Sequence, residues 1–263
     1  MKTGSFKHRG MRIRYGLQKG RGQELPLLMF NGIGQSIEVL TPLAQALPDI
    51  PALAFDVPGT GDSAVPRRPL RFCEHADIAA ALLDHLKIKR INLFGVSWGG
   101  ALAQQFAVQH RARVERLILA AAPLGNVMIP GKPSVYLRLL NFRRFWQSDY
   151  MHRIAGHIYG GDVRQDPAAV DEFMALLRTP SRKGYLFQAL SMAGWSALPL
   201  LSRIKAPTLI LQGDDDPMIP TVNARIMARL IPDSHLEILD CGHLFLLTRM
   251  KSVSPLIREF AYD

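Results

Sequence analysis

The sequence predicts an α/β fold, in which a mostly parallel central sheet is flanked by helices and interrupted by a helical insertion. Three observations favour this fold. Short runs rich in Leu, Ile, Val and Phe recur along the 263 residues, and their lack of polar alternation is typical of strands covered on both faces. Stretches with helical spacing separate most of these runs, which favours parallel strands. The alternation stops between about residues 124 and 205, where no convincing strand occurs.

The elements are predicted in chain order. The strands are expected at Leu27–Phe30, Ala52–Asp56, Ile91–Phe94, Arg116–Ala121, Thr208–Gln212 and His235–Leu239. The helices between them are expected at Glu74–Leu86, Gly99–Gln109 and Thr221–Leu230. The insertion is rich in Pro, Arg and aromatic residues, with helical pieces around Asp166–Arg178 and Gly184–Met192. We therefore interpret residues 1–263 as one α/β domain with an insertion at about 124–205, which we call the lid insertion.

Composition places the chain among ordinary globular proteins. Hydrophobic residues make up 48% and charged residues 21%, which excludes disordered, collagenous and coiled-coil classes. No apolar run approaches the roughly 18 residues of a transmembrane segment, and the basic N-terminus lacks the apolar core of a secretory signal. The two cysteines, Cys73 and Cys241, cannot build a disulfide scaffold. We expect a reduced, cytoplasmic protein.

Positive charge is concentrated in two regions. The formal net charge is +10; residues 1–22 hold seven Lys or Arg and no acidic residue, and the lid insertion holds eleven basic and five acidic residues. Such surfaces can meet nucleic acid, anionic lipid or an acidic substrate, but solubility is the simpler interpretation. The sequence has no zinc-finger, RRM or basic-zipper pattern, so nucleic acid is not an expected partner.

A serine nucleophile is predicted where the strand at 91–94 ends. The segment Gly95-Val96-Ser97-Trp98-Gly99-Gly100 has the G-x-S-x-G pattern between a strand and a helix, which is the context of a nucleophile elbow. Its glycines let strand and helix approach each other, so that the turn lifts the Ser97 hydroxyl clear of the sheet. The turn also directs the first amides of the helix at a bound carbonyl oxygen. A simple glycine-rich turn is the alternative interpretation.

A serine hydroxyl needs a base and an orienting acid, and in this architecture the acid and then the histidine follow the serine. Of the eight histidines, only His243 follows a late strand and a glycine, in Asp240-Cys241-Gly242-His243. The acid should end the preceding strand, where Gly213-Asp214-Asp215-Asp216-Pro217 offers three carboxylates. Asp216 is preferred because Pro217 fixes the loop after it, and Asp214 is the second choice.

A metal site is the alternative interpretation of this acidic triplet. The side chains of three consecutive residues point in different directions, and no His or Cys lies at the spacing typical of metal ligands. We therefore predict no metal, and acyl transfer by a serine, a histidine and an acid requires no organic cofactor.

The oxyanion formed when a serine attacks a carbonyl group is bound by two backbone N–H groups. One comes from the residue after the serine, and the second comes from a loop after the first core strand. Phe30-Asn31-Gly32-Ile33-Gly34 fits this position, and the candidate donors are the amides of Ile33 and Trp98.

These motifs resemble those of the α/β-hydrolase superfamily, and longer segments resemble one branch of it. The segments are LLMFNGIGQSIEVL, AFDVPGTGDSAVPRRPLRF, NLFGVSWGGALAQQFA, MIPGKP, IYGG, APTLILQGDDDPMIP and DCGHLFLLTR. Over nearly the whole chain they resemble intracellular depolymerases of medium-chain-length polyhydroxyalkanoates (PHA). The resemblance implies an α/β-hydrolase fold and hydrolysis of ester bonds in stored 3-hydroxyacyl polyester at the surface of PHA granules. It also implies an acyl-enzyme on Ser97, with Asp216 and His243 completing the triad.

The composition of the lid insertion agrees with a greasy acyl substrate. The insertion holds ten aromatic residues: Tyr136, Phe142, Phe145, Trp146, Tyr150, Tyr159, Phe173, Tyr185, Phe187 and Trp195. An aromatic lid over a serine elbow suits an apolar ligand, although about half of these rings should form the core of the lid itself. Apolar outer patches with Arg and Lys nearby lead to the hypothesis that the lid docks on a lipid- or polymer-coated granule.

Other functions on the same scaffold stay open, because a fold does not select a substrate. The nearest alternative is a carboxylesterase, an enol-lactonase or a carbon–carbon bond hydrolase acting on small soluble molecules. A non-catalytic ligand receptor and a structural granule-coating protein are alternatives from other classes. Haloalkane dehalogenase and epoxide hydrolase chemistry is disfavoured, because those enzymes have a carboxylate at the position of Ser97.

Overall fold

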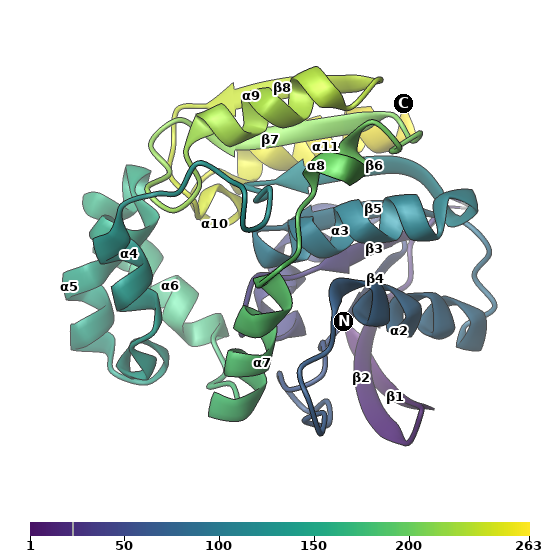
Figure 1. Cartoon of the computed structure of the whole chain (residues 1–263), viewed down its shortest axis with the longest axis horizontal. Helices are drawn as coiled ribbons and strands as arrows, with labels where there is room; N and C mark the ends of the chain where they lie inside the picture. The colour runs from purple at the N-terminus through teal and green to yellow at the C-terminus, as the bar shows by residue number, and fades with distance from the viewer. Residues whose placement is uncertain (23) are drawn as a thin grey trace.

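An eight-stranded sheet forms the centre of the molecule (Figure 1). The computed structural model describes residues 1–22 and 24–263. The strands, in sheet order, are β1 (Lys2–His8), β2 (Met11–Gln18), β4 (Ala52–Phe55), β3 (Leu27–Phe30), β5 (Ile91–Val96), β6 (Val114–Ala120), β7 (Thr208–Gly213) and β8 (Ser234–Leu239). β2 pairs antiparallel with both β1 and β4, and all other neighbours are parallel. The predicted α/β class with a mostly parallel sheet is confirmed.

The N-terminal hairpin is the part of the sheet that the sequence prediction omits. β1 and β2 form the edge of the sheet, and Arg9 and Gly10 make the turn between them with positive φ angles of 47° and 79°. Phe6 is the buried residue of β1, whereas the Lys and Arg side chains of the hairpin lie mostly outside the core. An edge strand with so few buried positions has no continuous apolar run, and such a run is the signal used for the other strands.

Helices cover both faces of the sheet. One face packs against α2 (Phe72–His85), α3 (Trp98–Gln109) and α9 (Thr221–Leu230), and the other against α1 (Thr41–Ala46) and α11 (Met250–Tyr262). Figure 1 shows α2 and α3 in front of the sheet and α11 behind it. Shorter elements are α10 (Phe245–Thr248) and the 3-10 segments η1 (Ile37–Leu40) and η2 (Arg111–Arg113). In the described part of the chain, no helix has the length and apolar character needed to cross a membrane.

The lid insertion joins β6 to β7 and is helical. It contains α4 (Pro133–Leu139), η3 (Phe142–Phe145), α5 (Ser148–Tyr159), η4 (Gly161–Arg164), α6 (Pro167–Leu176), α7 (Arg182–Met192) and α8 (Leu198–Leu201). Figure 1 shows α4, α5 and α6 grouped to one side of the sheet. These helices share an apolar cluster that includes Val135, Met151, Ile158 and Phe173. Leu124 and Leu201, near the ends of the insertion, belong instead to the main core.

Candidate active site

Ser97 lies in the sharp turn between β5 and α3, where the sequence predicts a nucleophile. Its φ of 54° and ψ of −123° lie in a region that non-glycine residues rarely adopt, so the surrounding structure must hold it there. Two glycines let the strand and the helix come close enough. A Cβ on Gly95 would lie 2.4 Å from the carbonyl oxygen of Gly99, and a Cβ on Gly99 would lie 2.3 Å from that of Phe30.

Asp216 and His243 meet behind this turn. Asp216 Oδ2 lies 2.6 Å from His243 Nδ1, and both side chains are buried. The other carboxylate oxygen accepts hydrogen bonds from the backbone N–H groups of Met218 (2.9 Å) and Ile219 (3.0 Å). The carboxylate is therefore held in one orientation, and its contact with Nδ1 leaves Nε2 as the ring nitrogen free to act on a substrate.

The three adjacent carboxylates have separate partners. Asp214 Oδ1 accepts a hydrogen bond from the backbone N–H of Cys241 at 3.1 Å. Asp215 pairs with Arg164 and accepts a hydrogen bond from the N–H of Gly161 at 2.7 Å. Asp216 is thus the member of the triplet that faces His243, and Asp214, the second choice from sequence, is bonded elsewhere.

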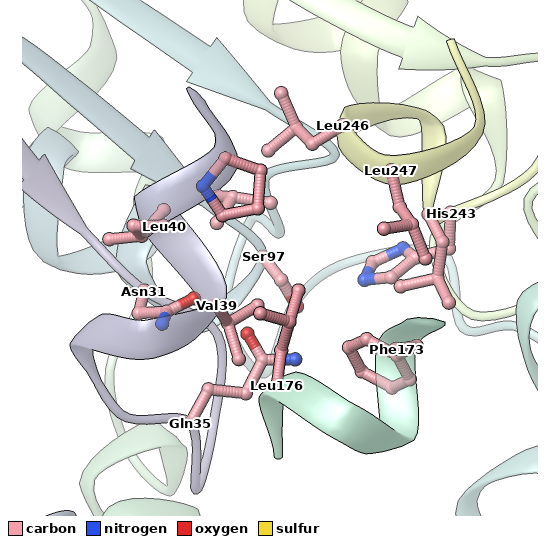
Figure 2. A pocket seen from close by; sticks show the side chains of 13 residues that line it. Asn31, Gln35, Val39, Leu40, Ser97, Phe173, Leu176, His243, Leu246 and Leu247 are labelled. Atoms are coloured by element: carbon pink, nitrogen blue, oxygen red, sulfur yellow. The ribbon is translucent and has the colours of Figure 1, made fainter. Parts of the chain in front are cut away.

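Ser97 and His243 line two adjoining cavities, which therefore meet at these residues. The small cavity has a volume of about 50 Å³ and mostly apolar walls, including Val39, Phe173 and Leu247. Figure 2 shows the imidazole of His243 and the side chain of Ser97 facing it. The large cavity, of about 340 Å³, extends under the lid insertion. Over the described residues no hydrogen bond joins Ser97 Oγ to His243; catalytic hydrogen bonds are often long until substrate binds.

Two residues that line the large cavity with Ser97 have backbone N–H groups without an acceptor among the described residues. Gly32 donates its N–H to Asn31 Oδ1 (2.9 Å), and Gly34 donates to Gln188 Oε1 (2.9 Å). Within residues 1–22 and 24–263, the N–H groups of Ile33 and Trp98 have no such acceptor, and both residues line the large cavity. The geometry thus leaves unpaired the two amides that the sequence singles out as donors.

Gln188, on α7 of the lid insertion, links the lid to both of these amide-bearing segments. Its side-chain oxygen accepts from Gly34, and its backbone carbonyl accepts from the Trp98 indole N–H at 2.9 Å. Its side chain is fully buried. The sequence analysis missed Gln188, because nothing in the local pattern of α7 distinguishes an inward glutamine that reaches a loop more than 150 residues away.

The lid insertion also contacts the loop that carries the histidine. The backbone N–H of His243 donates to the carbonyl of Tyr159 at 2.7 Å, and the two rings stack with their centres 6.4 Å apart. The chain segments are so close that a Cβ on Gly242 would lie 2.2 Å from the Tyr159 carbonyl oxygen. The close approach explains the glycine before His243 better than a special turn conformation, since Gly242 is not among the residues with positive φ.

Two other titratable groups near these residues are shielded by burial. Burial raises the pKa of the Cys241 thiol to about 12, so the thiol stays protonated and unreactive near neutral pH. Burial lowers the pKa of His75 to about 4. The His75 ring stands edge-on to the Trp98 ring, with 5.2 Å between centres, and supports the start of α3 from α2.

Comparison with known proteins identifies the family. A model of the α/β hydrolase fold family matches residues 26–249. The chain belongs to the α/β-hydrolase family. Within this family it is 45% identical to the poly(3-hydroxyalkanoate) depolymerase of Ectopseudomonas oleovorans over 249 aligned residues. The aligned region covers 94% of this chain and 88% of that protein. The predicted resemblance to α/β hydrolases and, among them, to poly(3-hydroxyalkanoate) depolymerases is therefore confirmed.

More distant α/β hydrolases share the fold. The 3-oxoadipate enol-lactonase 2 of Acinetobacter baylyi is 26% identical over 194 residues, covering 73% of this chain and 71% of that protein. The crystal structure of the enol-lactonase from Burkholderia xenovorans LB400 superposes with a TM-score of 0.85 at 22% identity, over 99% of this chain and 100% of the other. At that identity the likeness concerns the fold alone.

Proposed function

We propose that this chain is a serine hydrolase that cleaves the ester bonds of intracellular medium-chain-length poly(3-hydroxyalkanoate). The observation that carries the proposal is the position of Ser97 and His243 at the junction of two apolar cavities, with Asp216 buried behind the imidazole. An ester of this polymer has an alkyl side chain on both its acyl side and its alcohol side. Two apolar cavities that meet at the nucleophile fit one side chain each. The kinship with a poly(3-hydroxyalkanoate) depolymerase supports the same substrate.

The proposed reaction is acyl transfer through Ser97. His243 Nε2 takes the hydroxyl proton as Ser97 Oγ attacks the ester carbonyl carbon, while Asp216 holds the imidazole in the required tautomer and stabilises its charged form. The N–H groups of Ile33 and Trp98 bind the oxyanion, each lowering the barrier by about 3 kcal/mol. The C–O bond to the alcohol side then breaks, and His243 protonates the leaving oxygen. Water, activated by His243, releases the acyl group and restores Ser97.

A panel of three substrates tests this function: purified granules of medium-chain-length polyester, short-chain polyester and a soluble eight-carbon ester. The proposal predicts release of 3-hydroxy acids from the first substrate at the highest rate. Turnover of the soluble ester with no release from either polyester would favour a small-molecule carboxylesterase or lactonase. Tight binding of the soluble ester without turnover would favour a ligand receptor.

We also propose that the outer surface of the lid insertion docks on the polyester granule. Among the described residues, eleven large hydrophobic side chains are exposed, and eight of them lie in the lid insertion: Val127, Ile129, Leu137, Leu140, Trp146, Leu186, Leu190 and Leu198. Trp146 is the one aromatic ring among them, so aliphatic side chains rather than rings would make most of the contact. Leu140 also lines the large cavity, and exposed apolar surface therefore reaches the substrate site. Such surface is typical of proteins that bind apolar assemblies.

Docking is tested with a double variant, Leu137→Ser with Leu186→Ser, whose residues are 70% and 53% exposed and do not line either cavity. We expect it to bind granules at least several-fold more weakly in a sedimentation assay and to hydrolyse the eight-carbon ester at the wild-type rate. The matched control is Val222→Ser with Leu230→Ser, two exposed residues of α9, which should leave both activities unchanged. If granule binding and soluble-ester hydrolysis fall together in the lid variant, the docking proposal is wrong.

A further inference from the structure

A buried arginine of the lid insertion faces the substrate site. Arg144 belongs to η3, is 3% exposed and lines the large cavity that also contains Ser97 and His243. Its Nε donates to the carbonyl of Leu139 at 3.1 Å, and its Nη2 donates to the Tyr185 hydroxyl at 3.0 Å. Its guanidinium carbon lies 4.1 Å from the centre of the Phe145 ring. These contacts fix the guanidinium in one place.

Among the described residues, no anion compensates this charge. Over residues 1–22 and 24–263, no carboxylate oxygen lies within 4.0 Å of the Arg144 guanidinium, whereas the partly buried Arg14 pairs with both Glu38 and Asp56. Removing the charge of an arginine from water is costly in free energy unless an opposite charge is close. Neutral hydrogen-bond acceptors and an aromatic ring offset only part of that cost. An arginine kept in this state is one that a ligand can pair.

The remainder of the cavity wall indicates what kind of ligand this is. Among the described residues that line it, Arg144 is the one with a permanent charge; the others are apolar or neutral polar side chains, apart from the titratable His243. The cavity thus fits a molecule with an apolar body and a single anionic group. A planar guanidinium binds a carboxylate in a two-pronged geometry that a neutral ester carbonyl cannot match.

We propose that Arg144 binds the terminal carboxylate of a 3-hydroxyacyl chain in the large cavity. This inference rests on the proposed function. Inside a polyester chain every carbonyl belongs to a neutral ester, and one end alone bears a carboxylate. Pairing that end with Arg144 sets which ester reaches Ser97. The fragment with the carboxylate is then the alcohol-side product, which leaves with its new hydroxyl group, while the remainder of the chain is held on Ser97 as the acyl group. The enzyme would therefore shorten chains from the carboxyl end and release short hydroxy acids.

Inhibition measurements test the carboxylate site without using the polymer. Hydrolysis of p-nitrophenyl octanoate is measured with added 3-hydroxydecanoate or its methyl ester, which differ in the negative charge and in one methyl group. We expect the free acid to inhibit the wild-type enzyme at least about tenfold more strongly than the methyl ester does. A charge-assisted hydrogen bond gives an effect of this size. Equal inhibition by the two compounds would overturn the proposal, and this comparison needs no variant.

Substitutions then assign the preference to Arg144. Arg144→Met should abolish the preference for the acid, and Arg144→Lys should retain part of it. The matched control is Arg143→Met, which changes the neighbouring exposed arginine that binds Gln147 and should leave the preference intact. Near-UV circular dichroism establishes that the variants are folded. A preference for the acid that persists in Arg144→Met would overturn the assignment.

Defined oligomers separate this proposal from the proposed function. A trimer of 3-hydroxyoctanoate is offered as the free acid and as the methyl ester. We expect the wild-type enzyme to cleave the free acid faster and Arg144→Met to cleave both at similar rates. If the wild-type enzyme cleaves neither trimer but hydrolyses p-nitrophenyl octanoate, the polyester function fails, and the inhibition measurements still decide the role of Arg144. Faster cleavage of the methyl ester by the wild-type enzyme would contradict the proposed role of Arg144 but not the polyester function.

Discussion

The sheet with its packed helices and the lid insertion are held together in different ways. Both faces of the sheet are covered by large continuous apolar clusters, and the turn that carries Ser97 depends on contacts too close for any side chain. The lid insertion has a smaller apolar cluster, which Met218 and Ile219 of the loop after β7 join. Charged pairs tie it to the remainder of the molecule, including Arg178 with Asp62 at 3.1 Å and Arg249 with Asp162 at 2.7 Å.

This difference separates two tasks. The sheet places the three side chains proposed to break the ester bond, and it does so with packing that tolerates little change. The lid insertion supplies most of the large cavity, the arginine in it and the exposed apolar surface. Changes to the residues on the sheet should therefore have larger effects on the chemical step than changes in the lid insertion.

The largest expected effect is that of Ser97→Ala. Because the hydroxyl is the proposed nucleophile, kcat for an eight-carbon p-nitrophenyl ester should fall by at least about 10⁴-fold. The thermal midpoint should change little, since a single oxygen atom is lost and the backbone turn is kept. Retained turnover in a purified sample, checked against a mock purification, would overturn the assignment of the nucleophile.

A substitution of Asp216, the acid proposed to orient His243, should have the next largest effect. Asp216→Asn keeps the shape of the side chain but favours the wrong imidazole tautomer, and a fall in kcat of about 10³- to 10⁴-fold is expected. Asp214→Asn is the matched control, because Asp214 accepts a hydrogen bond from the backbone of Cys241 instead. Steady-state kinetics of the two variants decide between them, and an equal loss in both would contradict the choice of Asp216.

The buried His75 gives a stability effect with a defined pH window. Its pKa is about 4 in the folded protein and about 6.5 in an unfolded chain. Between these values the unfolded chain binds more protons, so the stabilisation is complete above pH 6.5 and is lost as the pH falls toward 4. From pH 6.5 to pH 5 the free energy of unfolding should fall by about 2 kcal/mol from this group. Urea unfolding of wild type and His75→Gln at both pH values tests this, and equal pH dependence in the two proteins would contradict it.

The smallest effect on kcat is expected for a substitution in the lid insertion. Gln188→Leu removes the acceptor for the Gly34 N–H and loosens the loop that presents Ile33, so kcat should fall about tenfold while KM changes little. Gln165→Leu, at an exposed position of the lid insertion, should leave both constants unchanged. If Gln188→Leu raises KM alone, Gln188 contributes to substrate binding rather than to positioning.

The ends of the parallel strands could be predicted from the sequence to within two residues, because most of these strands are continuous apolar runs. The strand at 27–30 and the helix at 221–230 have the predicted ends. The lid insertion was harder. Its helix α5 buries Met151, Ile154, Ala155 and Ile158, a spacing that marks an amphipathic helix, yet the surrounding polar and aromatic residues obscure that spacing.

The candidate site divides in the same way. Ser97, Asp216 and His243 stand in recognisable positions at strand ends, and the choice among three adjacent carboxylates rested on the proline after Asp216. Arg144 could not be predicted, because one of two consecutive arginines is exposed and the other buried, and tertiary packing alone decides which. Gln188 likewise acquires its role from a contact between distant segments.

The contact between Tyr159 and the His243 loop has a consequence for protein engineering. The segment at Gly160 and Gly161 packs so tightly on Gly242 that an added methyl group on Gly161 would lie 2.0 Å from a backbone nitrogen. When the lid insertions of related enzymes are exchanged, residues 159–161 should therefore be left unchanged, although they lie in the middle of the insertion. A chimaera that imports a foreign segment there would displace His243, the proposed general base, and its loss of turnover would be mistaken for a mismatch with the new substrate.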